Sequence, residues 1–239
     1  MKKNTMKKYR GLKKLDNRPT MAEWPVRIWS REEIPAEYKE IVEKWLNKDF
    51  SDYQLIFSPK RQSSDQSFEY LFGYGENEIL YLKATEDGIV KSVVERGEIR
   101  SVKTFRELLK AEITINYEKE GQAEQLAFPY VPSTYYLYDP FLNWLLGIER
   151  EFNTVMAERQ HPRPQKLYDE SLVMYNYSLH AYRLGDGFVD YTYRYEKYRP
   201  KWTPWKVLKK EWLEVPMERG DFRLYSFEYV TECVYLLKK

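Results

Sequence analysis

Apolar residues alternate with polar ones over most of residues 50–130, and this period of two predicts a series of short β-strands. Turn residues such as those of Gly75-Glu76-Asn77 separate the runs. Between the fifth and sixth runs, Thr104 and Glu107 have the spacing of a capping box, so a helical turn competes there with continued strand. Seven strands are expected, over residues 53–58, 67–74, 78–84, 89–95, 98–103, 112–118 and 123–128.

One amphipathic helix is expected on each side of these strands. Ser30 and Glu33 have capping-box spacing and apolar residues follow at helical intervals, which predicts a helix over residues 33–47. Behind the strands, Asp139-Pro140 is typical of an N-cap and first helical position. An apolar stripe continues from there for about 20 residues. The helix should end before Pro162 and Pro164, which mark a linker.

The most regular alternation lies in two tyrosine-rich runs between Leu172 and Tyr198, on either side of Gly185-Asp186-Gly187. A three-residue loop at these glycines gives both runs one apolar and one polar face, and places Tyr177 opposite Tyr195. We therefore expect a tyrosine-rich antiparallel sheet. A further strand is expected over residues 222–237.

Composition favours a water-soluble globular protein of 239 residues with 32% charged and 17% aromatic residues. No stretch is apolar enough for a membrane span or a signal peptide, which predicts a cytoplasmic location. Residues 1–18 carry eight Lys or Arg residues and one Asp. The expected divisions are a disordered basic arm (1–22), a helix with the β domain and its C-terminal helix (23–160), and the tyrosine-rich β region (165–239).

The order of seven short strands and one helix over residues 50–160 resembles the pleckstrin-homology-like (PH-like) domains of bacterial proteins. Within it, Ile99–Val102, Ile113–Ile115 and Phe128 are similar to the central strands of that family. The resemblance implies a seven-stranded barrel or sandwich capped by the helix, within a mainly β (α+β) chain. Many eukaryotic members bind phosphoinositides through basic residues, but Glu69 stands here where a basic pair is expected.

Two clusters of residues are candidates for binding or chemistry. Aromatic rings interleaved with cations suit single-stranded nucleic acid, a glycan or a membrane interface, although tryptophans equally serve as core residues. This first cluster comprises Arg199, Lys201, Trp202, Trp205 and Lys206. On the polar hairpin face, Ser178, His180 and Asp190 would supply a nucleophile, a base and an orienting group, on a surface too open to exclude water.

Known catalytic and phosphate-binding motifs are absent from the sequence, and the single cysteine, Cys233, cannot form an intrachain disulfide. We expect no metal and no cofactor, and the missing motifs favour a non-catalytic protein. The leading hypothesis is a protein-interaction or self-association module. One alternative is a binder of anionic membranes or nucleic acid through the basic arm and Arg199–Lys206, and a second is an enzyme that uses Ser178, His180 and Asp190.

Overall fold

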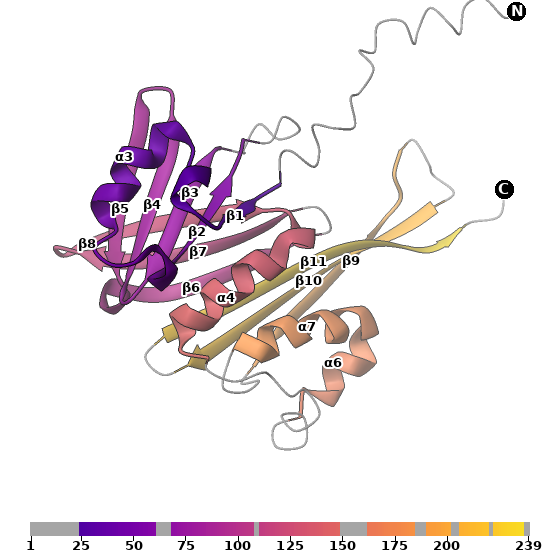
Figure 1. Cartoon of the computed structure of the whole chain (residues 1–239). Coiled ribbons are helices and arrows are strands. Elements are labelled where there is room, and N and C mark those ends of the chain that lie inside the picture. The colour runs from indigo at the N-terminus through magenta and orange to yellow at the C-terminus, as the bar shows by residue number, and fades with distance from the viewer. Residues whose placement is uncertain are drawn as a thin grey trace, which may run out of the picture.

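The computed structural model describes residues 24–60, 68–107, 110–148, 162–184, 190–201, 206–219 and 222–236. This part of the chain is mostly β, as the alternating pattern predicts, and its strands form two open sheets rather than a closed barrel (Figure 1). The predicted disordered basic arm, residues 1–22, lies outside the described residues.

The first sheet has five antiparallel strands in the order β1-β2-β3-β4-β5. Four of them confirm the first four predicted strands: β2 (Tyr53–Ser58), β3 (Tyr70–Gly75), β4 (Glu78–Thr85) and β5 (Gly88–Glu95). The short strand β1 (Val26–Ile28) was not predicted and forms one edge. Helix α3 (Ala36–Trp45) buries Tyr38, Val42 and Trp45 against one face of this sheet.

The second sheet has the order β8-β7-β6-β11-β10-β9. Strands β6 (Ile99–Arg106), β7 (Ala111–Lys119) and β8 (Gln122–Tyr130) confirm the last three predicted strands of the series. Strands β9 (Thr192–Tyr198), β10 (Lys206–Arg219) and β11 (Phe222–Leu236) extend the same sheet, because β11 pairs with β6 in parallel. The other pairs are antiparallel. Strand β10 was not predicted.

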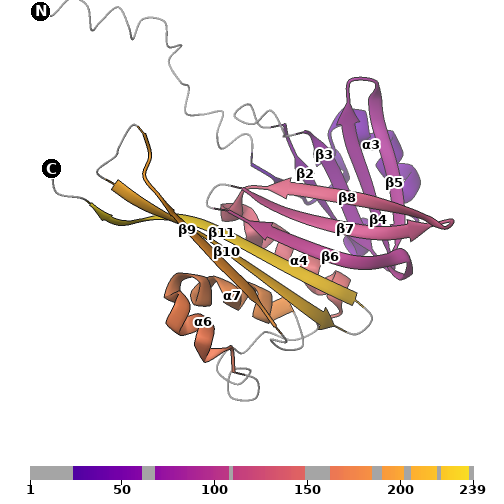
Figure 2. The ribbon, with the colours of Figure 1, turned by 180° about the vertical axis from the view of Figure 1, so that it is seen from behind.

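Helices α4 (Tyr135–Leu146), α6 (Gln165–Glu170) and α7 (Leu172–Leu184) lie on one face of the second sheet, and Figure 2 shows the opposite face free of any described helix. Helix α4 packs between the two sheets: the Phe141 ring lies 5.1 Å from that of Phe72 and 5.4 Å from that of Phe128, between ring centroids. The main core therefore joins both sheets and these helices into one cluster.

Two helix boundaries differ from the expected ones. The N-terminal helix is confirmed but begins at Ala36, after the 3₁₀ turn η1 (Arg31–Glu33), because Pro35 occupies the N-cap. Helix α4 begins at Tyr135, after the 3₁₀ turn η4 (Pro132–Thr134), so Asp139 and Pro140 lie inside it rather than at its start. It ends at Gly147, whose φ of 65° suits glycine. The expected extension to residue 160 falls largely outside the described residues.

The predicted hairpin between Leu172 and Tyr198 is wrong, because its first run forms α7 and only its second run forms a strand. Buried Met174, Ser178 and Tyr182 recur every four residues, which is a helical interval. The Ser171 hydroxyl accepts the Met174 N–H at 3.2 Å and caps the helix. Tyrosines are compatible with either period, so the alternation alone did not distinguish strand from helix.

The predicted cross-strand pair is wrong for the same reason. Tyr195 pairs with Glu211 of β10 and not with Tyr177, which is on α7. The tyrosine-rich antiparallel sheet therefore consists of β9, β10 and β11, and residues 165–184 precede it as helices α6 and α7.

Candidate functional site

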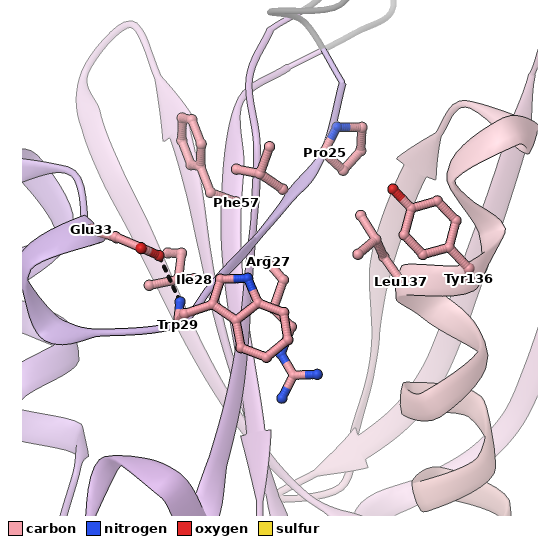
Figure 3. A pocket seen from close by; sticks show the side chains of 9 residues that line it. Pro25, Arg27, Ile28, Trp29, Glu33, Phe57, Tyr136 and Leu137 are labelled. Atoms are coloured by element: carbon pink, nitrogen blue, oxygen red, sulfur yellow. Dashed lines mark hydrogen bonds between the residues drawn. The ribbon is translucent and has the colours of Figure 1, made fainter.

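A hollow of about 580 Å³ lies between the edge strand β1 and the first turn of α4 (Figure 3). Most of its lining is apolar or aromatic, and Arg27 and Glu33 are its only charged groups among the described residues. The lining residues are Pro25, Val26, Arg27, Ile28, Trp29, Glu33, Phe57, Tyr136 and Leu137. A volume of this size lies within the range of about 300–1,000 Å³ usual for ligand sites.

The sequence around β1 forms the rim of the hollow. Val26 and Ile28 alternate with Arg27, and Ile28 is buried in the core beneath α3, which fixes the strand against β2. The Glu33 carboxylate then accepts the backbone N–H of Trp29 at 2.7 Å, so the chain turns directly from the strand into η1. In the described residues the other side of β1 has no strand partner.

Residues from both faces of β1 line the hollow, so it straddles the unpaired edge of the strand. Val26 and its cross-strand partner Phe57 line it from one side, while Tyr136 and Leu137 project toward it from α4 (Figure 3). Large apolar side chains remain exposed here: Trp29 is 66% exposed and Tyr136 is 59% exposed. Exposed apolar surface of this kind beside a sheet edge is typical of an interaction site.

Arg27 carries the positive charge of the hollow. Its guanidinium carbon lies 4.0 Å from the centroid of the Trp29 ring, a cation–π contact. The Nε atom is buried without a hydrogen-bond partner in the described part of the chain. Burial raises the pKa of the nearby Tyr74 hydroxyl, and the charge of Arg27 opposes that rise. The positive charge of Arg27 therefore affects the sheet interior as well as the hollow.

The arginine and tryptophan cluster predicted from sequence lies elsewhere. Arg199 and Lys201 are exposed just beyond the end of β9, and Lys206 begins β10. Trp202 and Trp205 lie outside the described residues. Neighbouring Tyr198 does make a cation–π contact, with Lys210 Nζ 4.6 Å from its ring centroid. None of the described members of this cluster lines the hollow.

Ser178, His180 and Asp190 are placed on two elements rather than on one sheet face. Ser178 is buried on α7, where its hydroxyl donates to the Tyr175 carbonyl at 2.7 Å and accepts from Arg163 at 3.3 Å. Asp190 is exposed before β9 and accepts the Tyr191 N–H. The backbone of His180 is in α7, and its side chain lies outside the described residues. The hydrogen bonds of Ser178 and Asp190 stabilise the local fold.

Glu69, where the sequence resemblance would predict a basic pair, accepts a hydrogen bond from the Tyr38 hydroxyl at 2.8 Å. Burial, and then this bond, raise the pKa of the Tyr38 hydroxyl. Nearby Lys83 lies over the Phe68 ring, with Nζ 4.2 Å from its centroid. Glu69 therefore joins α3 to the first sheet.

Sequence reasoning missed Arg27, Trp29 and Tyr136. The alternation of Trp24, Val26 and Ile28 was the available signal for β1, but three residues are too few for a period to stand out. The approach of β1 to α4 joins segments that are far apart along the chain, so nothing local in the sequence indicates it.

Within the described ranges, no group of three or more His, Cys, Asp or Glu side chains is arranged to hold a metal ion. No helix of the described chain has the length and apolar character needed to cross a membrane. Comparison of the sequence with protein-family models and with curated proteins finds no match.

Proposed function

We propose that this chain is a non-catalytic protein-interaction module, which adds an extended segment of a partner protein to β1 as a further strand. The observation that carries the proposal is the hollow beside β1, because it combines an unpaired strand edge with exposed aromatic side chains. Strand addition draws affinity from main-chain hydrogen bonds and specificity from pockets for alternate side chains.

We also propose a PH-like organisation for residues 53–146. Strands β2 to β8 followed by α4 have the order expected for such a domain, with four strands in one sheet, three in the next and the helix between them. Domains of this architecture serve as scaffolds for many functions, so the site rather than the fold determines the choice.

The β9 edge of the second sheet supports the choice of β1. There, β9 exposes Arg194, Glu196 and Lys197, and charged side chains of this kind protect an edge from further pairing.

Self-association through the tyrosine-rich sheet, the site expected from sequence, is less well supported, because Tyr193 turns inward and donates its hydroxyl to Glu211 at 2.7 Å.

A phage-displayed library of random nine-residue peptides, panned on the full chain, tests the proposal. We expect enriched peptides of strand-forming residues, whose binding falls at least tenfold in Trp29→Ala and Tyr136→Ala. Tyr195→Ala on β9 is the matched control, since Tyr195 and Tyr136 are both 59% exposed, and it should bind as the wild type does. Backbone amides of residues 25–29 should exchange more slowly with deuterium when peptide is bound.

The proposal fails if no peptide is enriched over a panning without protein, or if both groove variants bind every enriched peptide as tightly as the wild type does. The alternative of an anionic-polymer binder predicts a different result. Co-sedimentation with phosphatidylserine vesicles and gel shifts with single-stranded DNA would then show binding that weakens steeply with salt and ignores Trp29→Ala.

A further inference from the structure

Arg27, at the centre of β1, has no counter-ion in the part of the chain that the structure describes. Its Nε is buried with no hydrogen-bond partner among the described residues, and its guanidinium carbon lies over the Trp29 ring. A guanidinium carries five N–H donors, and a buried donor such as the Nε–H of Arg27 is ordinarily paired with an acceptor. The structure therefore favours the binding of an anionic acceptor at this position.

The described lining of the hollow does not supply this acceptor. Glu33 is the one acidic residue in its described lining, and its Oε2 is already engaged by the Trp29 backbone N–H. Figure 3 shows Glu33 and the Arg27 guanidinium on opposite sides of the Trp29 side chain. Because the described lining offers no other acid, we expect the bound molecule to supply the acid that pairs with Arg27.

The geometry of a strand fixes where that acid would stand. A residue directly opposite Arg27 on an added strand shares its face, with the two Cβ atoms about 5 Å apart. The residues before and after it point to the other face, where Val26 and Phe57 offer apolar contacts. We propose that the site selects an extended partner segment with the pattern apolar–acidic–apolar, the acid pairing with Arg27. This inference rests on the proposed strand addition at β1.

Charge near the site favours an acidic partner over this chain's own N-terminal residues. Residues 1–18 carry a net charge of +7 and join the chain shortly before β1. Such a segment attracts an acidic partner and speeds its encounter with the neighbouring groove. The same charge disfavours the arm itself as occupant, whether from this chain or from a second copy, because it would bring cations beside the unpaired Arg27.

Three fluorescein-labelled peptides test the inference by anisotropy. They carry Val-Glu-Val, Val-Gln-Val or Val-Lys-Val at the centre of one serine–threonine background. We expect the full chain to bind the glutamate peptide roughly tenfold more tightly than the lysine peptide, with the glutamine peptide between them. Arg27→Glu should reverse this order. Arg194→Glu, at an exposed arginine in the middle of edge strand β9, should leave it unchanged.

The possible failures are distinct. If all three peptides bind with equal affinity and Trp29→Ala weakens them all, strand addition stands and acid selection is overturned. A glutamate preference that persists in Arg27→Glu would assign the preference to residues 1–18 and also overturn the inference. Binding of none of the three peptides, together with failed panning, would remove the proposed function as well. The comparison of peptides on wild-type protein keeps the test valid if Arg27→Glu does not fold.

Discussion

Lys209 and Glu211 stand two residues apart on β10, and the lysine Nζ donates to the glutamate Oε1 at 2.7 Å. Both face the helices, and the Glu211 side chain is completely buried. The Tyr193 hydroxyl donates to the same oxygen. A carboxylate in this position depends on its partners, because its burial without them would be costly.

Loss of the lysine should therefore destabilise the protein more than loss of the pair. We expect Lys209→Met to lower the free energy of unfolding by about 3 kcal/mol, and Lys209→Met combined with Glu211→Leu to cost less than that single change. Urea denaturation measures both. Lys44→Met is the control, because Lys44 and Glu40 form an exposed pair that should contribute less than about 1 kcal/mol. Equal losses at Lys209 and Lys44 would contradict the buried role of Glu211.

The stability of the protein should depend on the charge of Glu211 in acid. Burial alone would raise its pKa, but hydrogen bonds from Lys209 and Tyr193 outweigh burial and hold the pKa below its usual value of 4.5. A depressed pKa stabilises the fold above about pH 4.5, and this contribution is lost as pH falls through the folded-state pKa. Glu211→Gln should show a smaller loss of melting temperature between pH 5 and pH 3 than the wild type.

Asp139 should behave in the opposite sense. Burial raises the pKa of its carboxyl, and Arg183 and Arg106 oppose that rise only in part. Asp139 therefore costs stability at neutral pH, and protonation in acid relieves that cost. Thermal melts of Asp139→Asn should show a steeper loss of stability on acidification than the wild type, and a parallel pair of curves would contradict this assignment.

At Gly73 of β3, the Trp45 ring of α3 packs directly against the backbone of the first sheet. A Cβ built on it would lie 2.9 Å from the Trp45 ring and 3.2 Å from Leu55, with little room for either to move. Gly73→Ala should therefore lower the free energy of unfolding by about 1–3 kcal/mol. Gly97→Ala is the control, since nothing lies within 4 Å of its Cβ, and it should change stability by no more than about 0.5 kcal/mol.

Two tyrosine hydroxyls join the core where α4 meets the first sheet. The hydroxyls of Tyr70 and Tyr138 lie 2.7 Å apart, and that of Tyr70 also donates to the Pro129 carbonyl at 2.9 Å. Tyr70→Phe should cost about 1–2 kcal/mol in guanidinium denaturation, because it removes hydrogen bonds from buried groups. Tyr136→Phe, at an exposed ring, should cost nothing measurable; a similar loss in both variants would show that the buried bonds contribute little.

The sequence was most informative where strands are joined by short turns. The alternation in β2 to β8 is informative because most strands that follow each other in the chain also pair in a sheet, as β3 and β4 do through Phe72 and Tyr81. Local reasoning failed in residues 172–184, where tyrosines that suit a pleated surface lie on a helix capped by Ser171. It failed again at β10, where the burial of Glu211 is explained only by Lys209 and Tyr193 and not by its own strand pattern.

The candidate site could not be predicted from local sequence patterns, for a related reason. Arg27 and Tyr136 belong to elements with most of the first sheet between them in sequence, and only the completed fold brings them to one hollow. The basic and aromatic stretch at Arg199–Lys206 was predicted as a binding site because its residues are adjacent in sequence. Adjacency in sequence is a poor guide where the site is built from a strand edge and a distant helix.

The parallel pairing of β11 with β6 also has a consequence for biosynthesis. When a ribosome has released β6, β7, β8 and α4, the side of β6 that receives β11 still has no partner, because residues 222–236 have yet to be made. For that interval the nascent chain presents a bare β-edge of the kind that promotes aggregation and recruits chaperones. Translation that stalls or stops before β11 would leave this edge of β6 open permanently, so protection of the edge depends on the synthesis of residues 222–236.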